Sequence, residues 1–358
     1  MCLGVFVVKY GVPTSLTIGS LCLSSPVLSA PIAGFTDRIF RGIVREFGGC
    51  GLIYTEMVSA GGWIDGRIPP DRLQGVESEP RPLGVQLWDR EERTIEEAAR
   101  RLADLDISVI DLNFGCPKKR IMGTHAAGAT LLRDPATVGR LVAAAVRGAG
   151  CVPVTAKMRL GPSMATRTAP DVARSAEANG AAAITVHGRT ADESYGIPSN
   201  RAMIAEVVHA VRVPVIANGD VVDAASALAT LRATGAAGVM VARGALTRPW
   251  VFREIAAALR GEAVPPAPTL EEQRALLLRH HAAMVEQESD RWGTVAMRKF
   301  AVRYLTGVSG SRPFRDRITR AENGAEFRSI VAEFFPDGRL VPRAPGAGEL
   351  EEPACGAA

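Results

Sequence analysis

Short apolar runs alternate with amphipathic segments along most of the chain. Eight apolar runs, rich in β-branched residues, lie at 26–34, 52–58, 82–88, 109–115, 153–160, 183–190, 214–221 and 238–246. The segments between them are rich in Ala, Arg and Glu and have helical periodicity, an alternation typical of parallel strands joined by helices. Eight such units match an α/β protein with a (β/α)8 TIM barrel in both number and length.

A doubly wound open sheet is the competing architecture for this pattern. That fold usually carries a GxGxxG fingerprint after its first strand, where the glycines approach a dinucleotide. No such fingerprint follows residues 26–34, so the barrel is favoured.

The segments that flank the barrel indicate further parts. Residues 15–26 alternate as a short hairpin would, and we expect it to cap the amino end of the barrel. Thr269 and Glu272 form a capping box that begins a helix after a Pro-rich stretch. The predicted organisation is an N-terminal extension (1–13), the barrel (14–260), a linker (261–268), a small all-helical domain (269–336) and a disordered tail (337–358).

Composition narrows the class of protein. The chain has 358 residues, 47% of them hydrophobic and 22% charged, as in soluble enzymes. No apolar run reaches the ~18 residues of a membrane helix, and the start of the chain lacks the basic segment of a signal peptide. The six cysteines form no CxxC pair and have no His at ligand spacing, which argues against a metal site. We therefore expect a reduced, cytoplasmic protein without metal or membrane contact.

Positive charge is concentrated near the end of the chain. The whole chain has a net charge of +4, whereas residues 291–320 hold eight basic residues and one acidic residue, a net charge of +7. Within the predicted helix 294–305, Lys299 and Arg303 lie one turn apart, and the apolar stripe comprises Met297, Phe300, Ala301 and Tyr304. Such a helix can bury one face and offer phosphate contacts with the other, although a merely solvated basic face is the alternative.

Polar residues stand near the ends of seven of the eight predicted strands. In a TIM barrel the chemistry lies at the carboxyl ends of the strands. These residues are Glu56, Gln86, Asn113 with Cys116, Lys157 with Arg159, His187 with Arg189, Asn218 with Asp220, and Arg243. Each alone has a structural explanation, but together they predict an active site.

Two strand ends have the composition of a phosphate site. The segments 218–221 and 242–246 place small residues before helices, where free backbone N–H groups favour an anion. A phosphate there, with Lys157 and Gln86 nearer the barrel axis, suits flavin mononucleotide (FMN). The Gln amide can pair with the pyrimidine edge of the ring, and the Lys can stabilise negative charge on the reduced ring.

Eight motifs, in order along the chain, resemble the tRNA-dihydrouridine synthase family, and within it the bacterial branch. They are APIAGFTDRIFR (30–41), TEMVSA (55–60), GVQLW (84–88), DLNFGCPKK (111–119), AKMRLG (156–161), TVHGRT (185–190), VIANGDV (215–221) and ARGALTRPWVFREI (242–255). The resemblance spans about residues 16–335 and departs from the family pattern in the loop 191–203. It implies an FMN-containing barrel that uses NADPH to reduce uridines in tRNA to dihydrouridine, with a C-terminal helical domain that holds the RNA.

The resemblance also implies roles for individual residues. Those expected to bind the flavin are Pro31, Ile32 and Ala33 around it, Gln86 and Lys157 at its ring, and His187, Asn218, Gly219, Asp220, Ala242 and Arg243 along its tail and phosphate. Asn113 is expected to orient the uracil or the flavin, and Arg298, Lys299 and Arg303 to contact tRNA.

Cys116 matches the family's proton donor. A thiol with a pKa of ~8.5 is mostly protonated at neutral pH, which suits a general acid. A nucleophilic cysteine would want a base beside it, and the sequence around Cys116 offers Lys but no His. Two other functions stay open: a flavin-dependent oxidoreductase of a free pyrimidine, similar to dihydroorotate dehydrogenase, and a tRNA-binding protein without catalysis.

Overall fold

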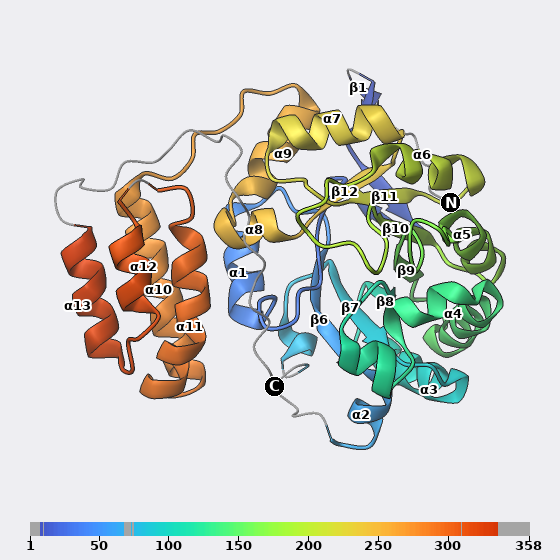
Figure 1. Ribbon diagram of the computed structural model, residues 1–358, viewed down its shortest axis with the longest axis horizontal. Helices are drawn as coiled ribbons and strands as arrows, with labels where there is room; N and C mark the ends of the chain where they lie inside the picture. Colours follow the sequence, from blue (N-terminus) through green and yellow to red (C-terminus); the bar gives the residue numbers. More distant parts are fainter. Residues whose placement is uncertain (1–7, 10, 68–72, 74, 309, 336–358) are drawn as a thin grey trace.

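Eight parallel strands form a barrel at the centre of the molecule (Figure 1). The computed structural model describes residues 8–335, except residues 10, 68–72, 74 and 309. The barrel strands are β5 (Val27–Ser29), β6 (Ile53–Ser59), β7 (Leu83–Trp88), β8 (Val109–Phe114), β9 (Val154–Arg159), β10 (Ala183–His187), β11 (Val215–Asn218) and β12 (Gly238–Val241). They pair in the order β5-β12-β11-β10-β9-β8-β7-β6, and a parallel bridge between Leu28 and Leu52 joins the two ends of the sheet. The predicted TIM barrel is confirmed.

Helices surround the barrel on its outside (Figure 1). They are α1 (Arg38–Phe47), α2 (Ala60–Ile64), α3 (Glu92–Ala103), α4 (Pro135–Ala149), α5 (Ala169–Ala178), α6 (Arg201–Ala210), α7 (Ala224–Thr234), α8 (Arg243–Thr247) and α9 (Val251–Arg260). Local sequence sets several of their starts. Asp134 caps α4 by accepting from the backbone N–H of Thr137, and Pro135 occupies the first helical position, where a missing N–H costs nothing.

A hairpin closes the amino end of the barrel, as predicted. It consists of β3 (Leu16–Ile18) and β4 (Leu21–Leu23), paired antiparallel. Its side chains Leu16, Ile18 and Leu23 are buried and join an apolar cluster with residues of the barrel interior, among them Leu28 and Leu52. This end of the barrel is therefore packed with side chains, and the opposite end is left for a site.

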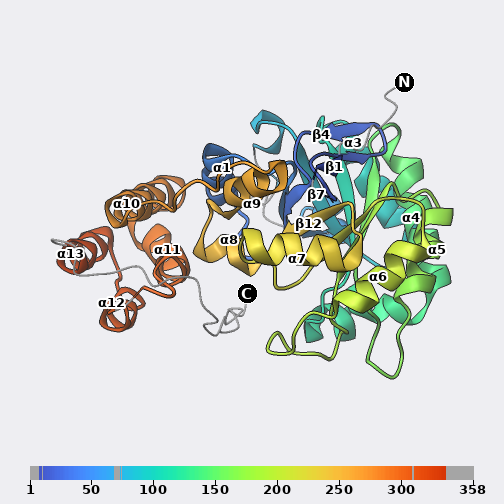
Figure 2. The same cartoon turned by 90° about the horizontal axis from the view of Figure 1, so that it is seen from above.

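The last four described helices form a separate bundle beside the barrel (Figures 1 and 2). They are α10 (Leu270–Gln287), α11 (Asp290–Tyr304), α12 (Arg312–Ile318) and α13 (Gly324–Phe334). The predicted capping box of Thr269 and Glu272 begins α10. The predicted apolar stripe of α11 is also confirmed, because Met297, Phe300, Ala301 and Tyr304 are all buried.

Aromatic contacts join this bundle to the barrel. Phe300 of α11 meets Phe35 edge-on, with ring centroids 5.4 Å apart, and stacks on Phe40 at 5.7 Å. Arg279 of α10 and Glu46 of α1 add an exposed ion pair at 2.6 Å. Exposed pairs of this kind contribute little, so the aromatic cluster contributes more to the attachment than this ion pair does.

The two ends of the chain are described only in part. Within the predicted extension 1–13, β1 (Val8–Lys9) and β2 (Val12–Pro13) form an antiparallel pair. The predicted tail, 337–358, lies outside the described residues. None of the helices in the described part of the chain has the length and apolar character needed to cross a membrane.

Candidate active site

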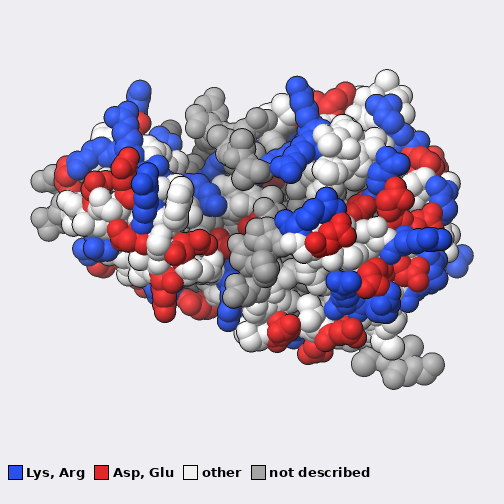
Figure 3. Space-filling model, turned by 90° about the horizontal axis from the view of Figure 1, so that it is seen from below, with Lys and Arg blue, Asp and Glu red and all other residues white. Residues whose placement is uncertain are grey.

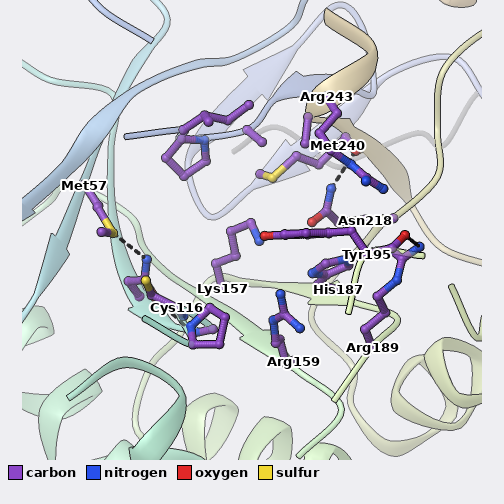
Figure 4. A pocket seen from close by; sticks show the side chains of 18 of the residues that line it. Met57, Cys116, Lys157, Arg159, His187, Arg189, Tyr195, Asn218, Met240 and Arg243 are labelled. Atoms are coloured by element: carbon purple, nitrogen blue, oxygen red, sulfur yellow. Dashed lines mark hydrogen bonds between the residues drawn. The ribbon is translucent and has the colours of Figure 1, made fainter. Parts of the chain in front are cut away.

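A pocket of about 340 Å³ opens at the carboxyl ends of the barrel strands (Figure 4). It is lined by every residue predicted to bind the flavin, together with Asn113 and Cys116: Pro31, Ile32, Ala33, Gln86, Asn113, Cys116, Lys157, His187, Asn218, Gly219, Asp220, Ala242 and Arg243. In Figure 4, Cys116 lies at the opposite end of the pocket from Arg243, with Lys157 between them. The barrel thus gathers residues that are far apart in the sequence into one cavity.

Neighbouring strands hold Gln86 and Asn113 in fixed positions. Asn113 Nδ2 donates to Gln86 Oε1 at 2.8 Å, and Asn113 Oδ1 accepts from the backbone N–H groups of Gly115 and Cys116 at 3.0 and 2.9 Å. A backbone N–H can only donate, so the direction of the Asn113 amide is determined. The turn that carries Cys116 is tied to the end of β8 by this amide.

Lys157 is a half-buried cation on β9, and Figure 4 shows it between Cys116 and Arg243 in the pocket. Burial lowers the pKa of its ammonium group to about 8, and the neighbouring carboxylate of Asp111 opposes that shift. The group therefore remains mostly charged at neutral pH. A cation in this position can stabilise negative charge on a bound ring.

His187 is neutral in this site. Burial and the nearby positive charge of Arg159 hold the pKa of its imidazole well below the usual range. Arg189 Nη1 lies 3.0 Å from His187 Nε2. Since a guanidinium can only donate, Nε2 accepts, and the ring proton resides on Nδ1.

Arg189 also connects the loop after β10 to the end of β11. Its side chain is 1% exposed and donates to Asp220 at 2.7 Å and to the backbone carbonyls of Tyr195 and Ile197. Arg189 Nη2 lies 2.7 Å from both carboxylate oxygens of Asp220, and Arg243 Nη2 donates to the Oδ1 of that carboxylate at 3.1 Å. The Asp220 carboxylate therefore orients two arginines at this end of the pocket.

Gly219 lines the pocket beside these arginines, in a closely packed turn after β11. Its φ of 122° is rarely adopted by other residues, and a Cβ there would lie 2.4 Å from Ser199 Oγ and 3.1 Å from His187 Cδ2. Asn218 Nδ2 donates to the carbonyl of Met240 at 2.9 Å, which ties β11 to β12 at this point. A compact turn with small residues and nearby arginines suits an anionic group, in agreement with the predicted phosphate position.

Tyr195, Arg159 and Arg189 are among the pocket residues for which the sequence predicted no role. Tyr195 lines the pocket, with its ring centroid 6.0 Å from that of His187, and the guanidinium groups of Arg243 and Arg159 lie 4.6 and 5.5 Å from its ring. Arg159 was expected at a strand end, but without a function of its own. Tyr195 belongs to an irregular loop, where no periodicity distinguishes a residue that turns inward.

The three residues predicted to contact tRNA lie on α11, outside the pocket. The Lys299 ammonium lies 5.3 Å from the Phe35 ring centroid, at the rim of the barrel. The charge of Arg303 reaches Arg243 in the pocket and helps to lower the pKa of that guanidinium, after burial and Arg189. Arg298 Nε donates to the carbonyl of Ala321 at 2.8 Å, so part of this side chain serves the helical bundle itself. Their contact with RNA stays a prediction.

The donor set of the pocket suits FMN. One wall is apolar, the centre offers an amide and a cation, and the far end combines the closely packed turn at Gly219 with Arg243. Ligand pockets of this kind have mostly apolar walls with a few convergent polar groups. Within the described part of the chain, no group of three or more His, Cys, Asp or Glu residues is arranged to hold a metal ion. The fold and the pocket are those of a TIM-barrel protein whose cavity at the strand ends is lined by apolar, amide and cationic groups.

Comparison with known proteins identifies the family. The family described as dihydrouridine synthase (Dus) matches residues 28–336, and the chain belongs to it. A probable tRNA-dihydrouridine synthase of Rhodobacter capsulatus is 39% identical over 325 residues, which cover 90% of this chain and 98% of that protein. The probable tRNA-dihydrouridine synthase of Rickettsia prowazekii is 36% identical over 321 residues, covering 89% and 97%.

A solved structure is similar in fold alone. The structure of a variant of NCR from Zymomonas mobilis matches with a TM-score of 0.50 and 14% sequence identity, covering 72% of this chain and 93% of that chain.

Proposed function

We propose that the protein reduces uridine to 5,6-dihydrouridine in tRNA, with FMN as its bound cofactor, NADPH as the reductant and Cys116 as the proton donor. Family membership supports the reaction class. The observation that supports the finer assignment is that one cavity is lined by Cys116 at one end, Arg243 at the other and Lys157 between them, with Gln86 and Gly219 also in its lining (Figure 4).

Reduction of the carbon 5 to carbon 6 double bond of uracil requires a hydride at carbon 6 and a proton at carbon 5. FMN, when bound and reduced by NADPH, supplies the hydride. Gln86 and Lys157 would bind the ring, and the Lys157 cation would stabilise its negative charge. His187, Asn218, Gly219, Ala242 and Arg243 would hold the tail and phosphate, while Pro31, Ile32 and Ala33 cover the apolar wall.

Cys116 would donate the proton to carbon 5. Its backbone is fixed by Asn113, so its side chain is presented from a turn of defined geometry at the edge of the pocket. A thiol in a fixed position can act as a general acid at neutral pH, and such a group commonly contributes a factor of about 100 to 10,000 in rate.

The helical bundle would hold the RNA through α11. Lys299 and Arg303 lie on the side of this helix that faces the barrel rim and the pocket. Acidic and basic side chains alternate over the face of the molecule shown in Figure 3, so overall charge does not mark an RNA surface there. The proposed contact is therefore confined to the region next to the pocket, where phosphates of a bound tRNA would meet these cations.

The test of the proposed function is the variant Cys116→Ala. Purified wild-type protein should contain FMN or take it up, and NADPH should reduce that flavin. Cys116→Ala should do both normally, because neither step uses the thiol, but its rate of tRNA reduction should fall by a factor of about 100 to 10,000. Cys116→Ser should recover little of this, since a hydroxyl is a far weaker acid than a thiol.

Each failure has a distinct meaning. Wild-type protein that cannot be reconstituted with FMN would exclude the cofactor assignment. A defect in flavin reduction as large as the defect in tRNA reduction would assign Cys116 to cofactor binding. Reduction of free uracil compounds in preference to tRNA would favour the pyrimidine oxidoreductase instead.

A further inference from the structure

A carboxylate lies buried beneath the site, and beyond its effect on the pKa of Lys157 it has no role in the proposed chemistry. Asp111 stands in the middle of β8 and is 1% exposed. Gln86 Nε2 donates to its Oδ2 at 2.6 Å, and Thr155 Oγ1 donates to its Oδ1 at 2.6 Å. The three side chains come from β7, β8 and β9 and stand opposite one another in the strand register. A buried charge in a barrel is costly, so a carboxylate at this position calls for an explanation.

These bonds continue into the pocket as a chain with one direction. The backbone N–H groups of Gly115 and Cys116 donate to Asn113 Oδ1, Asn113 Nδ2 donates to Gln86 Oε1, and Gln86 Nε2 donates to Asp111. The first donors are backbone groups that cannot accept. The last member must accept, and a carboxylate is the side chain that does so with both of its oxygens.

The direction of the chain fixes what Gln86 presents to the pocket. With its Oε1 turned to Asn113 and its Nε2 turned to Asp111, the amide keeps one N–H and one lone pair on defined sides. Such a pair is complementary to the alternating N–H and C=O groups of a pyrimidine-type ring edge. If the amide flipped, its Nε2 would face the Nδ2 of Asn113, and two donors would oppose each other.

We infer that Asp111 is a positioning residue, which terminates this hydrogen-bond chain and thereby sets the orientation of the Gln86 amide and the position of the Cys116 turn. The inference rests on the proposed function in one respect: that function assigns a ring contact to Gln86 and proton donation to Cys116. The chain of bonds itself depends only on residues of this protein.

Three variants distinguish the effect of the hydrogen-bond acceptor at Asp111 from the effects of its charge and its packing. Asp111→Leu keeps similar size but removes the acceptor. Asp111→Asn keeps an acceptor for Gln86 in its Oδ1, and its Nδ2 can donate to Thr155 Oγ1, so the chain survives without the charge. Thr155→Val is the matched control, because it removes the other donor to Asp111 and leaves the chain intact.

Two measurements on flavin-free protein report the two ends of the chain. The first is FMN affinity by fluorescence titration. The second is the rate at which iodoacetamide alkylates Cys116, followed by peptide mass spectrometry to separate it from the other cysteines. For Asp111→Leu we expect FMN binding about tenfold weaker, since a buried donor left unpaired costs on that order. Its Cys116 alkylation rate should also change severalfold, whereas Asp111→Asn and Thr155→Val should stay near wild type in both.

Other outcomes would overturn the inference. If folded Asp111→Leu matched wild type in both measurements, the chain would have no positioning role. If Asp111→Asn were as impaired as Asp111→Leu, the charge and not the acceptor would matter. Should Asp111→Leu not fold, Gln86→Leu cuts the chain at the next member, and unchanged Cys116 alkylation in that variant would refute the connection. Failure of wild-type protein to bind FMN would instead contradict the proposed function, and the alkylation result would still test the chain.

Discussion

Removal of the buried guanidinium of Arg189 should destabilise the protein and loosen its pocket. This group is 1% exposed and joins Asp220, His187 and two backbone carbonyls of the loop after β10. Taking away one partner of a buried ion pair costs about 3–5 kcal/mol. Asp220 is 34% exposed and keeps Arg243 as a second partner, which places the expected loss at the lower end, about 3 kcal/mol.

The variants Arg189→Met and Arg189→Lys test this reasoning. Lys carries its donors on one nitrogen and cannot reach acceptors on several sides, so Arg189→Lys should recover little of the loss. The free energy of unfolding is measured by urea denaturation with a common slope, and FMN affinity is measured in parallel. Arg174→Lys serves as control, because its pair with Asp171 is exposed and should change stability by less than about 0.5 kcal/mol. An Arg189→Lys protein within that same margin of wild type would refute the argument.

Three further expectations concern the pocket and α11. FMN affinity should decline as the pH rises through about 8, because burial lowers the pKa of Lys157 to about 8 and loss of its proton removes the cation at the ring. Fluorescence titration of FMN binding against pH checks this without involving the Cys116 thiol, and Lys157→Arg should keep its affinity to higher pH. Replacement of Lys299 and Arg303 by Ala should weaken tRNA binding and reduce the slope of log affinity against log salt by up to about two, with flavin content unchanged; an unaltered slope would mean that both cations are merely solvated. Gly219→Ala should abolish FMN retention and cost roughly 2 kcal/mol or more, since its Cβ would meet Ser199 at 2.4 Å, whereas Gly196→Ala, with a nearest neighbour at 3.6 Å, should behave as wild type.

The barrel was accessible from sequence because its strands are buried on both faces. Each of the eight apolar runs coincides with a strand. β5, at Val27–Ser29, is much shorter than the run 26–34, and β6 ends at Ser59, one residue beyond the run 52–58. Hydrophobicity marks burial, and Pro31 and Ile32 line the pocket without strand pairing. The gathering of the candidate site residues in one pocket could be predicted because parallel strands of a barrel bring their carboxyl ends to one edge. The roles of these residues stay predictions.

What the sequence could not supply are partnerships across strands and loops. The partners of Asp111 are 25 and 44 residues away, and its local signal is a charged residue within an apolar run. Tyr195 lines the pocket, and its backbone carbonyl accepts a hydrogen bond from the Arg189 side chain. The spacing of residues in the sequence does not predict this contact. Arg298 has the composition of an RNA contact, and only the structure shows that it bonds to the carbonyl of Ala321.

The aromatic cluster between the bundle and the barrel bears on whether this enzyme can be divided. Phe35 and Phe40, which receive Phe300, follow β5, the strand that meets β6 through the short bridge at Leu28. A chain truncated after α9 would lack Phe300, and Phe35 and Phe40 would lose this contact close to the point where β5 and β6 close the barrel. We therefore expect that the bundle cannot be removed without exposing part of the barrel. A chimera with a different bundle would need an aromatic residue at the position of Phe300 to pack on Phe35 and Phe40.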